Sequence, residues 1–271
     1  MPLVRDARAL YARAYDERFA MPAFNVCNLE MAQGVVEAAE AERAPVILQT
    51  YPGDIAHGGP GLAPMLRALG EEAGVPVILH LDHGQGLDMA VDRLRCGYSS
   101  VMFDGAELDL EENISRTKRI VEIAHAFGAS VEGEVGLFGG DHGSVVFTDP
   151  GEAELFMTNS GADTLAVSVG SEHHQQSRLD LARLEAISGR TNRPLVLHGG
   201  SGIYPEDVRE AVALGVVKIN IGHAISLAMT NGASEALESK LDHYEMFKVM
   251  RDRVRAVTRE KLRLMKATKR A

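Results

Sequence analysis

The sequence lacks the features that mark secreted, membrane-spanning or nucleic-acid-binding proteins. It has only two cysteines, Cys27 and Cys96, which form neither a disulfide framework nor a CxxC motif, so a reduced, cytoplasmic protein is expected. Charged residues interrupt the N-terminal segment, which has no apolar core of a signal peptide, and no segment has the apolar length of a membrane span. The net charge is −10 with no basic cluster near a candidate site, which argues against nucleic acid as a partner.

Short apolar, β-branched runs alternate with segments of helical periodicity along the 271 residues. This alternation predicts a single (β/α)8 TIM barrel over residues 1–271, with a helical C-terminal extension from Tyr244 to Ala271. A doubly wound open sheet is the alternative, but the GxGxxG turn expected after its first strand is missing. The predicted strands are Ala23–Val26, Val46–Thr50, Val77–Leu81, Ser99–Phe103, Ala129–Glu134, Thr164–Val169, Leu195–His198 and Val216–Ile221. The predicted helices include Leu29–Arg43, Leu62–Ala73, Leu87–Arg95, Leu110–Phe127, Pro150–Asn159 and Pro205–Leu214.

Glycine and proline punctuate this pattern. Helix C-terminal caps are predicted at Gly74, Gly97, Gly128, Gly161 and Gly215. Prolines that directly precede a predicted strand are Pro45, Pro76 and Pro194.

The run His80-Leu81-Asp82-His83 closes one predicted strand and puts a carboxylate beside a candidate metal ligand. His173 and His198 follow two later strands, at the carboxyl-terminal rim where the catalytic residues of such barrels lie. A catalytic zinc site uses three protein ligands and keeps one position open, and these two histidines with His83 meet that count. Asp82 is then either a general acid–base or a residue that orients an imidazole.

Two later loops predict an anion site. Gly199-Gly200-Ser201-Gly202 follows one strand and Asn220-Ile221-Gly222-His223 follows the last. Glycines let backbone N–H groups approach an anion, and barrels often bind phosphate on the loops after strands seven and eight. Lys218 shares strand parity with Asn220, so a lysine-imine aldolase is an alternative, although it leaves the histidines unexplained.

Seven ordered stretches resemble the class II, zinc-dependent fructose- and tagatose-bisphosphate aldolases over nearly the whole chain. They are Pro22–Val26, His80–His83, Ser100–Gly105, Val131–Gly136, Asp163–Gly170, Leu197–Ser201 and Lys218–Ile221. The resemblance implies an aldolase in which Asp82 exchanges a proton with a substrate hydroxyl and Asn220 contacts the donor ketone or enediolate.

The same resemblance implies a metal site and a set of substrate contacts. The implied metal ligands are His83, His173 and His198, with Glu134 approaching the metal and Asp104 and Glu132 supporting the ligands. The implied substrate contacts are Asn25, Tyr51, His174, Gly199, Gly200, Ser201 and His223. The cofactor is expected to be Zn²⁺, with another divalent metal and an additional monovalent cation left open. A homodimer or homotetramer is also implied.

Departures from the family pattern concentrate around the two ends of the substrate. Tyr51 stands in place of a serine, His174 of a small residue and His223 of a phosphate-binding threonine. The loop after the fifth strand is shortened, and Asp141 or His142 is the predicted proton donor to the donor carbon. The arginine that binds the far phosphate has no match near residues 242–244.

We therefore expect a metal-dependent class II aldolase that uses a zinc-stabilised enediolate. Its substrate is expected to be a ketose or ketose phosphate other than the usual bisphosphate. The alternatives are a metal-dependent sugar isomerase or epimerase that uses the same enediolate, and a non-catalytic, aldolase-like partner subunit.

Overall fold

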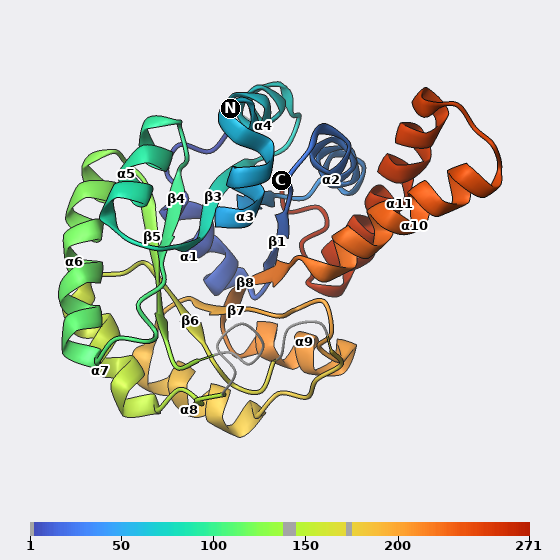
Figure 1. The fold of residues 1–271 in the computed structure, drawn as a ribbon. Coiled ribbons are helices and arrows are strands. Elements are labelled where there is room, and N and C mark those ends of the chain that lie inside the picture. Colours follow the sequence, from blue (N-terminus) through green and yellow to red (C-terminus); the bar gives the residue numbers. More distant parts are fainter. Residues whose placement is uncertain (1–2, 138–144, 172–174) are drawn as a thin grey trace.

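The computed structural model describes residues 3–137, 145–171 and 175–271, and these form a closed barrel of parallel strands surrounded by helices (Figure 1). Each strand pairs with the next in sequence, and β8 closes the barrel on β1. The strands are β1 Met21–Asn25, β2 Val46–Thr50, β3 Val77–Gly84, β4 Ser100–Phe103, β5 Ser130–Val135, β6 Thr164–Val167, β7 Leu195–Leu197 and β8 Val216–Ile221. This topology confirms the predicted (β/α)8 barrel.

Most of the helices cover the outside of the barrel, where their apolar faces pack on the strands, and the last two form a projecting pair. The helices are α1 Arg8–Glu17, α2 Leu29–Glu42, α3 Pro52–Gly58, α4 Leu62–Glu72, α5 Leu87–Arg95, α6 Leu110–Ala126, α7 Pro150–Ser160, α8 Leu181–Thr191, α9 Pro205–Ala213, α10 His223–Glu238 and α11 His243–Leu264, with a short 3-10 turn at Gly59–Gly61. Among the described residues, no helix combines the length and the apolar character needed to span a bilayer.

The predicted strand and helix boundaries lie within two residues of the observed ones, except at the end of β3 and in the C-terminal segment, and one predicted glycine cap differs as well. β3 extends beyond Leu81 to Gly84, because the chain stays paired with β4 past the predicted end. Gly74 is not a left-handed cap, since α4 ends at Glu72 and the Gly74 N–H donates to Glu40. The other four predicted cap glycines do have positive φ.

The third difference lies in the C-terminal segment. The helical prediction to Ala271 is wrong after Leu264, where α11 ends. The chain turns there because Met265 is fully buried and its carbonyl accepts the N–H of Ala20, next to the start of β1. Before this turn, α10 and α11 lie side by side and extend away from the barrel (Figure 1).

Candidate active site

The end of β3 brings two neighbouring side chains to one place. In a regular strand Asp82 and His83 would point to opposite faces. The pairing with β4 shifts register between Leu81 and Gly84, and His83 has a left-handed φ of 48°. Such a bulge redirects a side chain. Glycine at position 84 permits this close approach, because a Cβ there would lie 2.4 Å from the carbonyl oxygen of Met102 on β4.

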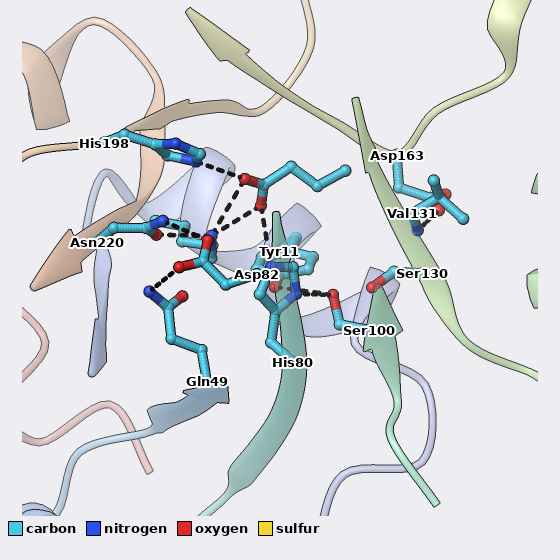
Figure 2. Close-up of polar contacts among 12 residues, drawn as sticks. Tyr11, Gln49, His80, Asp82, Ser100, Ser130, Val131, Asp163, His198 and Asn220 are labelled. Atoms are coloured by element: carbon cyan, nitrogen blue, oxygen red, sulfur yellow. Dashed lines mark hydrogen bonds and ion pairs between the residues drawn. The ribbon is translucent and has the colours of Figure 1, made fainter. Parts of the chain in front are cut away.

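Three side-chain amides hold the Asp82 carboxylate, as Figure 2 shows for two of them. Asn220 Nδ2 on β8 donates to Oδ1 at 2.9 Å. Asn25 Nδ2 on β1 donates to Oδ2 at 3.0 Å, and Gln49 Nε2 on β2 donates to the same oxygen at 3.1 Å. Four strands therefore fix one carboxylate that is only 4% exposed.

The charge state of Asp82 follows from its surroundings. Burial by itself raises the pKa of the carboxyl, but the positive charges of His83, His198 and Lys218 outweigh it and lower the pKa below its ordinary value. Asp82 is therefore ionised at neutral pH and can accept a proton. This is the charge state that a general base needs.

Two imidazoles stand next to Asp82, and a carboxylate orients each of them. His83 Nδ1 lies 2.7 Å from Asp104 Oδ2, and His198 Nε2 lies 3.0 Å from Glu132 Oε1. The two rings are edge to face, with centroids 4.8 Å apart. Potential ligand atoms of Asp82, His83 and His198 all lie within 4.8 Å of one another. Carboxylates that orient ligating histidines are typical of metal sites.

A second group at the same place contains His83, Asp104 and Glu134, whose potential ligand atoms also lie within 4.8 Å of one another. Glu134 Oε2 is buried without a hydrogen-bond partner among the described residues. Burial raises the pKa of this carboxyl well above its ordinary value, and the charge of Asp104 raises it further. Burial by itself lowers the pKa of His83, but the charge of Asp82 and the hydrogen bond to Asp104 raise it to about 10.

These residues fit a divalent cation. The position is negative enough to hold a proton on His83, and it offers imidazole nitrogens together with an unsatisfied carboxylate oxygen, the ligand types of zinc. His173, the third predicted ligand, lies outside the described residues, as do His174, Asp141 and His142. The described part of the chain therefore contains two of the three predicted histidine ligands, and it brings them together.

Below this position a buried ion pair connects the strands. Lys218 Nζ, fully buried inside the barrel, lies 2.9 Å from Glu132 Oε2 and donates to Asn220 Oδ1 at 2.7 Å. Because the lysine supplies only donors, it fixes which end of the Asn220 amide is the oxygen, and the nitrogen is left to face Asp82. Glu132 thus supports His198 directly and Asp82 through two intermediates.

The network continues toward the opposite end of the barrel (Figure 2). His80 Nδ1 lies 2.7 Å from Ser100 Oγ, and its Nε2 lies 3.7 Å from Glu132 Oε2. Tyr11 on α1 reaches the same serine at 3.4 Å. His80 is therefore a buried supporting residue.

A cleft of about 340 Å³ opens above Asp82 and His83. The predicted contact residues that line it are Asn25, Tyr51, Gly199, Ser201, Asn220 and His223. Gly200 has a different environment: its N–H donates to the Asn220 carbonyl, and a Cβ there would lie 2.2 Å from Ile219 Cγ2. Ser201 Oγ accepts the N–H of Ala224 in the first turn of α10.

The predictions do not include every residue of the site, and Gln49 and Asp54 are two that they omit. Gln49 holds Asp82, and its signal in the sequence is a polar residue within the apolar strand Val46–Thr50. Asp54, in the first turn of α3, lines the cleft at 8% exposure. The pKa of Asp54 is raised to about 6. Burial is the main cause and the charge of Asp82 adds to it, while the hydrogen bond from the Tyr51 N–H acts in the opposite direction. Nothing in the sequence distinguishes Asp54 from an ordinary acidic residue at a helix start.

Comparisons with known proteins agree with the barrel fold. The model of the class-II fructose-bisphosphate aldolase family matches residues 5–270. A fructose-bisphosphate aldolase of Thermus caldophilus is 36% identical over an alignment that covers 100% of this chain and 98% of the relative. A probable fructose-bisphosphate aldolase of Bacillus subtilis is also 36% identical, over 90% of each chain. The crystal structure of the YdjI aldolase from Escherichia coli K12 superposes with a TM-score of 0.91 at 32% identity, over 99% of both chains.

Proposed function

Since this chain belongs to the class II fructose-bisphosphate aldolase family and is therefore a lyase, we propose that it cleaves and forms a C–C bond in a ketose or ketose phosphate other than the usual bisphosphate. The observation that carries the proposal is the Asp82 carboxylate, held by amides from three other strands and adjacent to His83 and His198. A base fixed in this way is pre-organised for proton transfer.

In the cleavage direction, Asp82 removes the proton from the hydroxyl two carbons from the ketone. The resulting C=O forms as the C–C bond breaks, and the electron pair of that bond passes into the donor carbonyl to give an enediolate. Asn220, whose amide nitrogen already faces Asp82, is placed to donate to a donor oxygen. Return of a proton to the donor carbon is assigned to Asp141 or His142, which stays a prediction.

The metal is expected to be held by His83, His173 and His198, with Glu134 near it. Bound there, a divalent ion would supply Lewis-acid stabilisation for the negative charge that develops on the donor oxygens. Asp104 and Glu132 keep the two described imidazoles in orientation. Zinc is the proposed ion, with another divalent metal and a monovalent cation as open alternatives.

The imine alternative is weakened by the surroundings of Lys218. Its ammonium is ion-paired with Glu132 and donates to Asn220, and it is fully buried beneath the cleft. A lysine that forms an imine needs an unprotonated amine that reaches the substrate carbonyl. Lys218 is instead placed to orient Asn220.

The substrate change is proposed from the residues at the cleft. Gly199 and Ser201 lie next to the N-terminus of α10, where backbone donors favour an anion. Tyr51 and His223 line the cleft in place of the serine and threonine of the family pattern. A phosphorylated donor end with an altered acceptor end is the substrate that these residues favour.

The proposal is tested by assaying zinc-loaded protein on fructose and tagatose bisphosphates and on the matching ketose 1-phosphates. Released aldehyde, detected with a coupled dehydrogenase, distinguishes cleavage from isomerisation or epimerisation. We expect cleavage of a monophosphate and weak turnover of both bisphosphates. Bisphosphate turnover in the usual aldolase range would contradict the substrate change, and isomerised product without aldehyde would contradict the reaction.

A homodimer or homotetramer is proposed as the assembly, and a cytoplasmic location stays a prediction from cysteine usage. The assembly is supported by apolar side chains around the end of the α10–α11 pair, where Leu237 is 69% and Tyr244 is 74% exposed, with Phe247 also exposed. Apolar residues gathered on one projecting surface are typical of protein contacts. Light scattering after size exclusion checks the mass, and a monomer at micromolar concentration would contradict the proposal.

A further inference from the structure

The cleft has two walls of different chemistry. One is formed by the loops after β7 and β8, with Gly199, Ser201 and Gly222 at the N-terminus of α10. The other is formed after β1 and β2, with Asn25 and Asp54. Because the strands follow the order β7-β8-β1-β2-β3 around the barrel, the second wall lies between the first wall and the end of β3.

Asp82 lies at the bottom of the cleft and reaches both walls. Its Oδ1 accepts from Asn220 on β8, and its Oδ2 accepts from Asn25 on β1. The second wall lies between the first wall and Asp82, so a substrate with an anionic end on the first wall and its reacting hydroxyl at Asp82 passes within reach of the loops after β1 and β2.

Asp54 is held in position on that second wall. Its Oδ2 accepts the Tyr51 N–H at 3.2 Å, across the first turn of α3. The Tyr51 ring lies against Gly53, where a Cβ would be 2.5 Å from the ring, so a larger residue at position 53 would require the ring to move. The Asn25 side chain, which donates to Asp82, also favours the ionised form of Asp54 and so lies between this wall and Asp82. Among the described residues, no lysine or arginine forms an ion pair with Asp54.

We propose that Asp54 determines acceptor specificity, by accepting a hydrogen bond from a hydroxyl of an uncharged aldehyde end and repelling a phosphorylated one. This inference rests on the proposed aldolase function and names its substrate class: a ketose phosphorylated only at the donor end. A hydroxyl is a strong donor to a carboxylate, whereas a phosphate would face a like charge in a partly buried cleft.

The charge of Asp54 also predicts a pH dependence. The charged or titratable groups that act on it are Asp82 from β3, His57 from α3 and Cys27 from the loop after β1. Because its pKa is raised to about 6, Asp54 is ionised at pH 7.5 and becomes protonated as the pH falls through about 6. Discrimination against a phosphorylated aldehyde should weaken over the same range.

The first experiment measures aldol addition by zinc-loaded protein, with dihydroxyacetone phosphate as donor and either glyceraldehyde or glyceraldehyde 3-phosphate as acceptor. The ratio of the two kcat/KM values is the readout, because the active fraction and the metal content cancel. Wild type should favour glyceraldehyde, and Asp54→Asn should shift the ratio toward the phosphorylated acceptor by about tenfold. Asp109→Asn, a change at the helix cap of α6, is the matched control and should leave the ratio unchanged. An unchanged ratio in Asp54→Asn, or wild type that prefers the phosphorylated acceptor, overturns the inference.

The second experiment needs no enzymatic activity. Cys27 lines the same cleft, and Asp54 contributes to the raised pKa of its thiol after burial. Its alkylation by anionic iodoacetate and by neutral iodoacetamide, followed by mass spectrometry of the Cys27 peptide, gives a rate ratio independent of thiol ionisation. Asp54→Asn should raise the iodoacetate:iodoacetamide ratio severalfold at Cys27 and leave it unchanged at Cys96, the internal control.

The two experiments separate the inference from the proposed function. If no donor–acceptor pair gives product but the alkylation ratio at Cys27 changes as expected, the aldolase proposal is contradicted and the inference that Asp54 repels anions is retained. If aldol product forms but the alkylation ratio at Cys27 is unchanged, only the inference that Asp54 repels anions is overturned.

Discussion

The two halves of the barrel mouth are built differently. Around Asp82, the functional side chains are buried and each is held by others, as with Glu132, Lys218 and Asn220. On the wall formed after β2, Tyr51 is 45% exposed, and Asp54 accepts a hydrogen bond from the backbone N–H of Tyr51, three residues before it. The first half is a network that spans the barrel, and the second is a local arrangement within one turn of helix.

This difference indicates which half can change without loss of the fold. A buried network must be kept complete, because removing one partner leaves an unsatisfied polar group or charge in the interior. Residues on a partly exposed loop can be exchanged at little cost, and loops at this rim commonly determine the substrate of a barrel enzyme. Among the described residues, His83, His198 and Asp82, which are proposed for metal binding and proton transfer, belong to the first half, whereas Tyr51, a departure from the family pattern, belongs to the second.

The largest effect is expected from His198→Ala, which removes one proposed metal ligand from the buried half. Lewis-acid stabilisation is worth several kcal/mol, so kcat/KM should fall by about 10³-fold or more, and bound metal should fall with it. Activity and metal content by mass spectrometry check this. His125→Ala is the matched control, because His125 pairs with Asp163 away from the site. A variant that keeps full metal and full activity would remove His198 from the ligand set.

Asp82→Asn should lower kcat by about 10²–10³-fold while metal content stays near that of wild type. Asparagine keeps the shape of the side chain but cannot take a proton, and one of the three amides around it loses its acceptor. Single-turnover cleavage and metal analysis separate the two effects. Metal loss in proportion to the loss of activity would instead assign Asp82 to metal binding.

The barrel and most helix boundaries could be predicted because they depend on local periodicity. β2 and β8 have the bounds expected from their apolar runs, and α5 has the bounds expected from its helical pattern. The bulge at Asp82 and His83 could not be predicted, since strand alternation places adjacent residues on opposite faces. Its cause is the close approach at Gly84, which depends on the neighbouring strand.

The sequence could predict that Asp82, His83 and His198 lie together, because these residue types carry chemistry at strand ends, and their roles stay predictions. The supporting interactions were less so, because they depend on which side chains meet across the barrel. Gln49 had a weak signal, and Asp54 had none. The roles of His173, His174, Asp141 and His142 remain predictions, because these residues lie outside the described part of the chain.

Lys218→Met tests whether the stability of the buried half depends on the ion pair between Lys218 and Glu132. The change leaves Glu132 as an uncompensated buried charge, which should cost about 3–5 kcal/mol of unfolding free energy. Denaturant unfolding of the metal-free protein measures it. Adding Glu132→Gln should recover part of the loss, because the unpaired charge is gone. Equal stability of the single and double variants would indicate that packing, and not charge, governs this position.

Asp54→Asn should have the smallest effect of these variants, and it should raise the free energy of unfolding, whereas Lys218→Met should lower it. The folded-state pKa of Asp54 is raised to about 6, so its favourable contribution exists below its unfolded pKa and is lost as the pH rises through about 6. At pH 8 the ionised carboxyl therefore destabilises the fold, and the neutral variant should be more stable by about 1–3 kcal/mol. Asparagine can still accept the Tyr51 N–H, so the first turn of α3 is preserved. Unfolding of the metal-free protein across pH 4–8 checks this: the gain should shrink as the pH falls through about 6 and nearly disappear by about pH 4. A pH-independent difference would mean that the carboxylate is well solvated, and the cleft would then have no wall capable of rejecting an anion.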